Sequence, residues 1–169
     1  STIVLPGGSL PETERPEYVA PKPVAPPTPS YNYSYSNSGQ RINVHVVERW
    51  TYARSMMGDG NRMAPGQCTW YAWYWRKYFS NNPLPSAALG NANAWASSLA
   101  RYGYVVNRTP SVGAVFQTSA GYYGHVGVVT AINGDGSLTV REMNYLYRSY
   151  VVTEGVIPAS AVGSFNYIH

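Results

Sequence analysis

The sequence has a single cysteine, few charged residues and no long apolar run. One cysteine excludes an intramolecular disulfide, and it also excludes zinc and iron–sulfur sites that need several thiolates at set spacings. Because no run of about 18 or more apolar residues is present, the sequence predicts no membrane-spanning helix. With 169 residues, the chain can form one domain with a proper core but not two large ones.

Charged residues make up only 12% of the chain, and their distribution is uneven. Residues 1–40 contain two basic and three acidic side chains, whereas residues 41–169 contain ten basic and five acidic ones. A basic surface rich in aromatic side chains suits any polyanion. The chain contains neither a lysine-rich tract nor a recognised nucleic-acid motif, so we expect no nucleic-acid partner.

The first forty residues are rich in proline and tyrosine. Eight of the 13 prolines fall between Pro6 and Pro29, and the polar repeat YNYSYSNSG follows them. Proline removes backbone donors, and the stretch lacks periodic apolar positions, so residues 1–40 are predicted to form an extended, flexible linker. A spacer to an anchor or upstream module is the favoured interpretation, with a docking motif as the alternative.

Residues 41–62 form a lead-in segment whose structure the sequence leaves open. Ile42, Val44 and Val46 alternate as in a strand, whereas Val47, Trp50 and Arg54 are spaced as in a helix. The folded domain that follows is predicted to cover residues 63–169. Whether residues 41–60 cover its groove as an inhibitory flap is a further open question.

Cys68 lies at the start of a predicted amphipathic helix, GQCTWYAWYWRKYF, over residues 66–79. Cys68, Ala72, Trp75 and Phe79 form an apolar stripe along it. At the first turn of a helix, the helix dipole and unpaired N–H groups favour thiolate over thiol and can stabilise an oxyanion. Cys68 is therefore a candidate nucleophile, although a lone cysteine on such a stripe is often only a small apolar side chain.

His125 is the histidine that lies within a clearly patterned element. It opens a predicted strand over residues 125–132, which the turn sequence NGDG connects to a second strand over residues 137–145. A four-residue loop places His125 opposite Asn144 and Glu142 opposite Gly127, diagonal to the imidazole. Either polar side chain could then orient the imidazole as a base for Cys68. The alternative is a solvated Glu142 and a purely structural His125.

The remaining patterns complete an α+β outline. GNANAWASSLARYG, residues 90–103, predicts a second helix, and GAVFQT, YVVT and SFNYI predict further short strands. We expect the helix that carries the nucleophile to pack on an antiparallel sheet of about five to six strands.

With Cys68, His125 and Glu142 assembled, the sequence resembles the CHAP domain, the cysteine- and histidine-dependent amidohydrolase/peptidase family. It is most similar to the secreted staphylococcal-antigen type. The resemblance runs from Gly66 to His169 and is carried by these stretches: GQCTWYAW, GNANAWASSLARYGYVV, TPSVGAVFQT, GYYGHVGVV, DGSLTVREMNY and ASAVGSFNYIH.

The resemblance implies a papain-like fold and cleavage of peptidoglycan amides, either between muramic acid and L-alanine or within the peptides. It makes Cys68 the nucleophile, His125 the general base and later acid, and Glu142 the residue that orients His125. Asn144 is a fourth polar member, and Gln67 is a candidate oxyanion donor. Aromatic side chains near the site are candidates for substrate binding: Trp70, Tyr122, Tyr123 and Tyr145.

Some CHAP relatives hold Ca²⁺ with acidic residues on both sides of the cysteine. Asp59 and Asn61 stand at suitable upstream positions, but Trp70 stands where a downstream aspartate is expected. One carboxylate carries too little charge for a tight calcium site. We therefore expect no metal and no cofactor.

The expected partners are peptidoglycan and its associated anionic wall polymers, met by a monomer that is secreted or associated with the cell wall. The chain itself carries no predicted membrane span, and an anchor before Ser1 is left open. Two alternatives share the sequence features. One is a cysteine peptidase or amide transferase directed at proteins, and the other is a basic wall-binding module whose catalytic machinery is idle.

Overall fold

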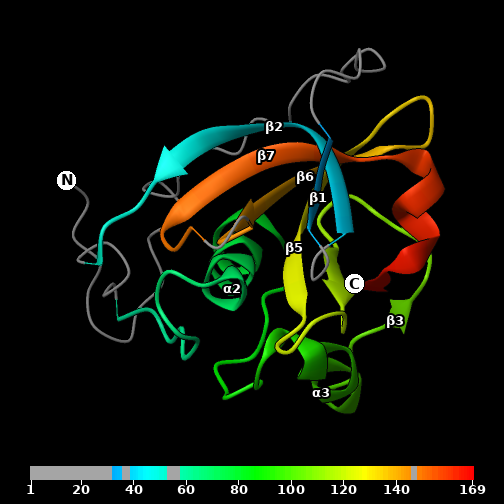
Figure 1. Cartoon of the computed structure of the whole chain (residues 1–169). Helices are drawn as coiled ribbons and strands as arrows, with labels where there is room; N and C mark the ends of the chain where they lie inside the picture. Colours follow the sequence, from blue (N-terminus) through cyan, green and yellow to red (C-terminus); the bar gives the residue numbers. More distant parts are fainter. Residues whose placement is uncertain (1–31, 36–38, 53–57, 146–147) are drawn as a thin grey trace.

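A computed structural model describes residues 32–35, 39–52, 58–145 and 148–169. Within them, eight strands form one antiparallel sheet in the order β1-β2-β7-β6-β5-β4-β8-β3 (Figure 1). The strands are β1 (Asn32–Tyr35), β2 (Gly39–Arg49), β3 (Val106–Asn107), β4 (Val115–Thr118), β5 (His125–Ile132), β6 (Leu138–Met143), β7 (Val151–Ile157) and β8 (Asn166–Ile168). The helices are α2 (Cys68–Phe79) and α3 (Trp95–Arg101), with short 3₁₀ helices η2 (Ala92–Ala94) and η3 (Ala159–Ser164).

The predicted α+β class and antiparallel sheet are confirmed, but the sheet has more strands than the five to six expected. The additions are β1 and the two-residue β3, and β2 is longer than the alternation predicted. Short polar strands lack the apolar alternation on which such predictions rest, because their pairing comes from backbone hydrogen bonds at the sheet edge.

Helix α2 lies against β5 and β6 beneath the arch of the sheet (Figure 1). The predicted helix is present, but its apolar surface extends well beyond one stripe, since Trp70, Trp73 and Tyr74 are also buried. Trp50, which follows β2, packs edge-on against Trp70 at 5.0 Å between ring centroids. The lead-in segment therefore covers a face of α2 that a one-sided pattern assigns to solvent.

The β5–β6 hairpin reaches the predicted pairing near the site by an unexpected route. The loop is one residue longer than predicted, since Ile132 pairs with Leu138. A bulge at Thr130 then shifts the register back, and Val128 pairs with Arg141. The two irregularities offset each other, so Gly127 and Glu142 still lie side by side.

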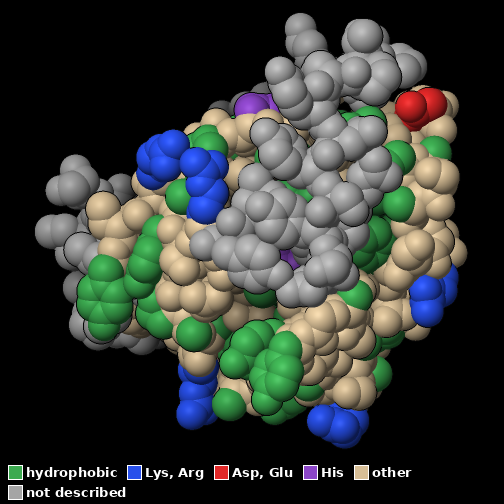
Figure 2. Space-filling model, viewed as in Figure 1, with side chains coloured by type: hydrophobic (Ala, Val, Ile, Leu, Met, Phe, Trp, Pro, Cys, Tyr) green, Lys and Arg blue, Asp and Glu red, His purple; other side chains and the backbone are tan. Residues whose placement is uncertain are grey.

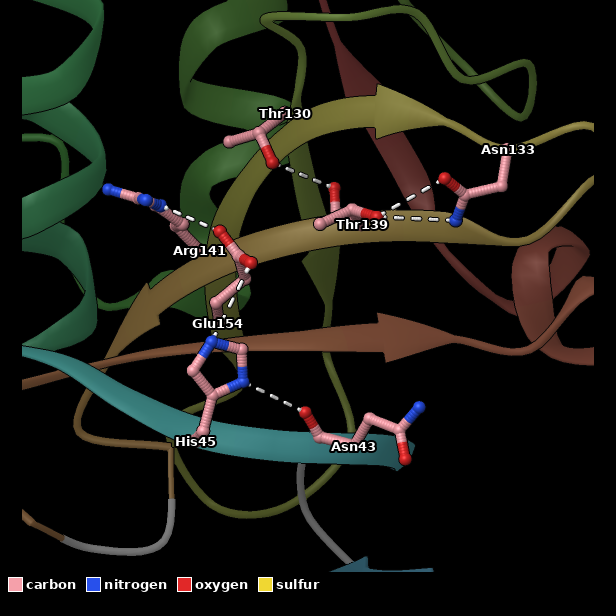
Figure 3. A network of polar contacts seen from close by, with 7 residues as sticks. All are labelled: Asn43, His45, Thr130, Asn133, Thr139, Arg141 and Glu154. Atoms are coloured by element: carbon pink, nitrogen blue, oxygen red, sulfur yellow. Dashed lines mark hydrogen bonds and ion pairs between the residues drawn. The ribbon is translucent and has the colours of Figure 1, made fainter. Parts of the chain in front are cut away.

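Polar side chains hold the bulge in place (Figure 3). Thr130 Oγ1 donates to the backbone oxygen of Thr139 at 3.2 Å. Asn133, at the start of the loop, donates from Nδ2 to Thr139 Oγ1 at 3.2 Å. All three side chains are buried, and each bond satisfies a polar group that would be costly to bury alone.

The lead-in segment adopts the strand alternative. β2 pairs with β7 from Ile42 to Arg49, with two register shifts and with Asn43 at a φ of 53°. Arg54, part of the helical alternative, lies outside the described residues. Most of the predicted linker over 1–40 also lies outside them. Of that stretch, residues 32–35 form β1 and residues 39–40 begin β2.

The sheet carries a core on each face. The larger one lies between the sheet and the helices, and the smaller one gathers Phe116, Val129, Leu138, Phe165 and Tyr167 on the opposite face. The sheet curls around the smaller core, because the Arg41 guanidinium of β2 lies 5.0 Å from the Phe116 ring of β4. Arg41, which precedes the CHAP-like residues 66–169, is thus brought to the middle of the molecule.

Candidate active site

Cys68 is the first residue of α2 and is half-buried with a free thiol. The turn before it depends on Gly66, whose φ is +81° and where an added Cβ would lie 2.8 Å from the Tyr150 ring. A side chain at this position would be strained and would displace that ring. The close approach of Tyr150 therefore sets the path by which the chain enters α2.

His125 begins β5 and lies beside Cys68. Its Nε2 is 2.7 Å from Oε1 of Glu142, and both side chains are buried. The two groups lie close enough for His125 to lower the pKa of the Cys68 thiol and for the sulfur to raise the pKa of the imidazole. Since Nε2 is occupied by the carboxylate, Nδ1 is the ring nitrogen left for the sulfur. The structure thus brings together the three residues that the hairpin and helix patterns predicted.

The three groups shift one another's proton affinity. Burial raises the pKa of Cys68, but the charge and hydrogen bond of His125, with backbone N–H groups of Val126 and Thr69, outweigh it and lower that pKa overall. Burial opposes a charged His125, yet the sulfur and then Glu142 raise its pKa to about 9. These directions favour a thiolate–imidazolium pair, which is the reactive form of a cysteine nucleophile.

Arg41, which sequence reasoning counted only as a charge, completes the surroundings of Glu142. Its Nε donates to Oε2 at 2.8 Å and its Nη2 donates to Oε1 at 3.1 Å. Burial raises the pKa of Glu142, but Arg41 and then His125 lower it overall, so the carboxylate stays ionised. A signal was available, since a glutamate that shares a strand face with Leu138 and Val140 needs a cation if it is buried.

Asn144 does not reach His125 as predicted. β6 ends at Met143, and Asn144 takes a left-handed φ of 58°. Its N–H still donates to Val151 O of β7 at 3.2 Å, but it is not among the pairs between β5 and β6. Its Nδ2 donates to Gln67 Oε1 at 2.7 Å, and its buried Oδ1 has no hydrogen-bond partner among the described residues. The carbonyl end of the Gln67 amide is held by this bond, while its Nε2 makes a long contact of 3.5 Å with Ser149 Oγ.

The four aromatic candidates for substrate binding fall into two groups. Trp70 is only 1% exposed and stacks on Tyr74, and Tyr145 is also buried, with its ring over the Arg41 guanidinium. The expectation that these two contact substrate does not fit their burial in the core. Tyr122 and Tyr123 are 83% and 61% exposed on the loop that leads into His125.

That loop is tied to η2. The backbone N–H of Asn93 donates to Tyr123 O at 2.8 Å, and Asn93 Nδ2 donates to Tyr122 O at 3.2 Å. Gly124 then has a φ of +70°, and a Cβ there would lie 2.6 Å from Asn93 N. Both tyrosines are therefore presented to solvent on the segment that immediately precedes His125. On the face shown in Figure 2, basic side chains lie at several separate places around the rim.

Asp59 and Asn61, which stand at the positions where some CHAP relatives hold Ca²⁺, are hydrogen-bonded to other residues of the chain. Asp59 Oδ2 accepts from the Tyr78 hydroxyl at 2.6 Å, and Oδ1 accepts from the Asn61 N–H at 3.1 Å. Lys77 Nζ donates to the Asp59 carbonyl at 2.9 Å. The described residues contain no group of three or more His, Cys, Asp or Glu side chains placed to hold a metal. That calcium does not bind stays a prediction.

A family model for the CHAP domain matches residues 58–144, which is about half of the chain. The chain belongs to the CHAP domain family. The matched CHAP segment contains Cys68, His125, Glu142 and Asn144, and it begins after Arg41 and β2. The predicted family and its papain-like α+β fold are therefore confirmed.

Relatives of known name support the same CHAP assignment. The chain is 42% identical over 152 residues to the staphylococcal secretory antigen SsaA of Staphylococcus epidermidis, across 85% of this chain and 56% of that protein. It is 45% identical over 115 residues to the probable autolysin SsaALP of Staphylococcus aureus, across 68% of this chain and 43% of that protein. The chain thus spans about half the length of these curated relatives.

A solved structure has a related fold. A crystal structure described as N-acetylmuramoyl-L-alanine amidase from Staphylococcus aureus superposes with a TM-score of 0.57 at 32% identity, over 62% of this chain and 30% of that one. Among the described residues, none of the helices has the length and apolar character needed to cross a membrane.

Proposed function

We propose that this chain is the catalytic CHAP domain of a secreted or wall-associated peptidoglycan hydrolase that cleaves an amide with Cys68. The observation that carries the proposal is the placement of Cys68, at the first turn of α2, beside His125, whose Nε2 is hydrogen-bonded to Glu142. The names of the relatives, an autolysin and an N-acetylmuramoyl-L-alanine amidase, support peptidoglycan as the substrate class.

In the first half-reaction, Cys68 Sγ attacks the amide carbonyl carbon, and the C=O electron pair moves onto oxygen. The Cys68 backbone N–H and Gln67 Nε2 are the proposed donors to this oxyanion. The C–N bond then breaks as His125 Nδ1–H gives its proton to the leaving nitrogen. The products are a free amine and a thioester on Cys68.

In the second half-reaction, neutral His125 takes a proton from water while the water oxygen attacks the thioester carbonyl. Collapse of the intermediate breaks the C–S bond, releases a carboxylic acid and restores the thiolate–imidazolium pair. Glu142 holds the imidazole orientation through both steps, and its negative charge stabilises the imidazolium. Asn144 acts as a positioning residue for the Gln67 amide.

The exposed Tyr122–Tyr123 pair is the proposed contact for the wall polymer. The two rings lie 4.7 Å apart in an edge-on arrangement, and each presents apolar surface and a hydroxyl to solvent on the loop that leads into His125. Dispersed basic side chains could contact anionic wall polymers, and the domain is proposed to act as a monomer.

The test is incubation of purified cell walls with the wild-type chain and with Cys68→Ala. We expect new amino groups to be released by the wild type alone, and equal release by both proteins would refute the proposal. Mass spectrometry of the released fragments then identifies the bond. A new free L-alanine amino terminus indicates the amidase, whereas a new amine within the peptides indicates the endopeptidase. If the wild-type chain leaves cell walls uncleaved but cleaves a denatured protein, the result would favour the protein-directed peptidase instead.

A further inference from the structure

We propose that Arg41, on a strand upstream of the matched family segment, is a positioning residue that holds the catalytic carboxylate of Glu142 against His125. Glu142 and Arg41 are 101 positions apart in the sequence, and they meet because β2 joins the curled sheet beside β7. The proposal rests on the proposed role of Glu142, but its test also has a readout that needs no peptidoglycan.

The contact geometry fits positioning. Two nitrogens of the Arg41 fork bind the two oxygens of Glu142, which fixes the carboxylate plane as well as its place. Oε1 then accepts from both Arg41 Nη2 and His125 Nε2, whereas Oε2 is taken by Arg41 Nε. Rotation of the carboxylate away from the imidazole would break all of these bonds together.

The surroundings hold the guanidinium in turn. Arg41 is 0% exposed, and its charge lies 5.0 Å from the ring centroids of Phe116 and Tyr145 and 5.4 Å from that of Phe165. Cation–π attraction and dense packing restrict a side chain that is otherwise flexible. Tyr145, which the sequence analysis named as a candidate for substrate binding, is buried because its ring forms one wall of the Arg41 site.

The neighbouring ion pair shows that this contact is specific. Arg141 precedes Glu142 on β6 but points to the opposite face of the sheet, where its Nε donates to Glu154 Oε2 at 3.1 Å (Figure 3). His45 Nε2 lies 3.7 Å from Glu154 on that same side. Among the described residues, the charged or titratable groups that contact Glu142 are Arg41 from β2 and His125 from β5, through which Cys68 of α2 is reached.

The position of Arg41 relative to the family match gives β2 a role in catalysis. The matched segment starts at Gly58, so it includes the acid but not the cation that holds it. Residues 58–169 make up about two thirds of the chain, and the likeness to SsaA of Staphylococcus epidermidis covers 85% of it, so that likeness extends upstream of Gly58. Strand β2 of the lead-in segment is accordingly part of the catalytic machinery on this proposal, whereas residues 53–57 of the segment lie outside the described residues.

The test compares Arg41→Met, Arg41→Lys, Glu142→Gln and Arg41→Met/Glu142→Gln with the wild type, and uses Arg49→Met as the control. Arg49 is an exposed arginine on the same strand. In Arg41→Met, we expect kcat on cell walls to fall by about 10- to 100-fold with little change in KM, because the carboxylate loses its fixed orientation. Arg49→Met should match the wild type.

The second readout is the rate at which Cys68 is alkylated as a function of pH. Arg41 lowers the pKa of Glu142, so its removal raises that pKa, and the acid becomes neutral as pH falls through a higher range than in the wild type. A neutral acid no longer stabilises the imidazolium. Alkylation of Arg41→Met should therefore decline at mildly acidic pH where the wild type still reacts, and Arg41→Lys should keep the wild-type profile but lose part of kcat.

The double variant separates positioning from a merely structural role. If Arg41 acts through Glu142, adding Arg41→Met to Glu142→Gln lowers kcat by less than about threefold, because the coupled effect is already lost. Full additivity, or an unchanged alkylation profile and kcat in Arg41→Met, would overturn the proposal. If Arg41→Met does not fold, Arg41→Lys is compared with the wild type, and Arg41→Met/Glu142→Gln, in which no buried charge is left unpaired, is compared with Glu142→Gln. If the alkylation profile changes in Arg41→Met but the wild-type chain does not cleave cell walls, the positioning role of Arg41 is supported and peptidoglycan is rejected as the substrate.

Discussion

At the scale of single residues, the site depends on small side chains as much as on reactive ones. Gly127 lies opposite Glu142, where an added Cβ would be 2.6 Å from Phe116 Cε1 and 2.9 Å from Glu142 Cβ. Phe116 is one of the rings around Arg41. The absence of a side chain at Gly127 therefore lets the carboxylate, its cation and the ring pack together.

Gly127→Ala is expected to destabilise the fold by about 1–3 kcal/mol, because the surrounding side chains are rigid and overpacking is costly. Urea denaturation measures the change, and the displaced Glu142 should also lower the hydrolysis rate. Gly134→Ala, in the loop of the same hairpin, is the control, since a Cβ there meets nothing within 4 Å. Equal stability of the two variants would contradict this description of the site.

The pKa of His125 predicts the alkaline limit of activity. The imidazolium must supply a proton to the leaving nitrogen, and its pKa is raised to about 9 by the sulfur and Glu142. As pH rises through that value the proton is lost, so kcat/KM on cell walls should fall near pH 9 and stay high below it until the thiolate is lost. Circular dichroism at each pH controls for unfolding, and a rate that falls with the ordinary histidine near pH 6.5 would be inconsistent with this pairing.

At the scale of elements, the hairpin shows both the strength and the limit of pattern reasoning. Alternation along β5 and β6 correctly predicted that His125 and Glu142 share a face. The four-residue loop was wrong, and with the observed loop a regular ladder would place Glu142 on the opposite face from His125. The bulge at Thr130 restores the pairing, and no residue type in a single sequence marks such a bulge in advance.

Two single-residue deletions test this compensation. Deleting Thr130 turns the bulge into a regular ladder and keeps the pair of Val128 with Arg141, so measurable hydrolysis should remain. Deleting Val128 shifts His125 by one position and moves its ring to the other face, so hydrolysis should be lost. Activity of both folded variants on cell walls is the measurement, and the reverse order of activity would show that the bulge does not set the register.

At the scale of the whole molecule, the folded domain includes β2, which lies upstream of the matched CHAP segment of residues 58–144. The helix, the hairpin and the meeting of Cys68, His125 and Glu142 could be predicted because each depends on local periodicity. The position of Arg41 could not be predicted, because its contact with Glu142 joins β2 to β6. These strands are separated by β7 in the sheet, and their side chains meet only because the sheet curls. Asn144 was misplaced for a local reason, because a left-handed residue at the end of β6 breaks the alternation that the prediction extended.

Truncation tests the size of the domain. A chain of residues 58–169 loses β2, which removes Trp50 from α2 and leaves Glu142 buried without Arg41. We expect it to lose cooperative thermal unfolding and activity, whereas residues 32–169 should retain both. Circular dichroism melts and wall hydrolysis compare the two with the full chain. A cooperative, active fragment of residues 58–169 would show that the lead-in segment is dispensable.

The most direct test of the whole account is the pH dependence of Cys68 alkylation in the wild type and in His125→Ala. Because His125 lowers the pKa of Cys68 against the effect of burial, the wild-type thiol should titrate below the ordinary value of 9.0. In His125→Ala, only the backbone N–H groups of Val126 and Thr69 still oppose the effect of burial, so the midpoint should rise above that of the wild type. A wild-type thiol that titrates at or above 9.0, with no change on removal of His125, would contradict an activated nucleophile at this site.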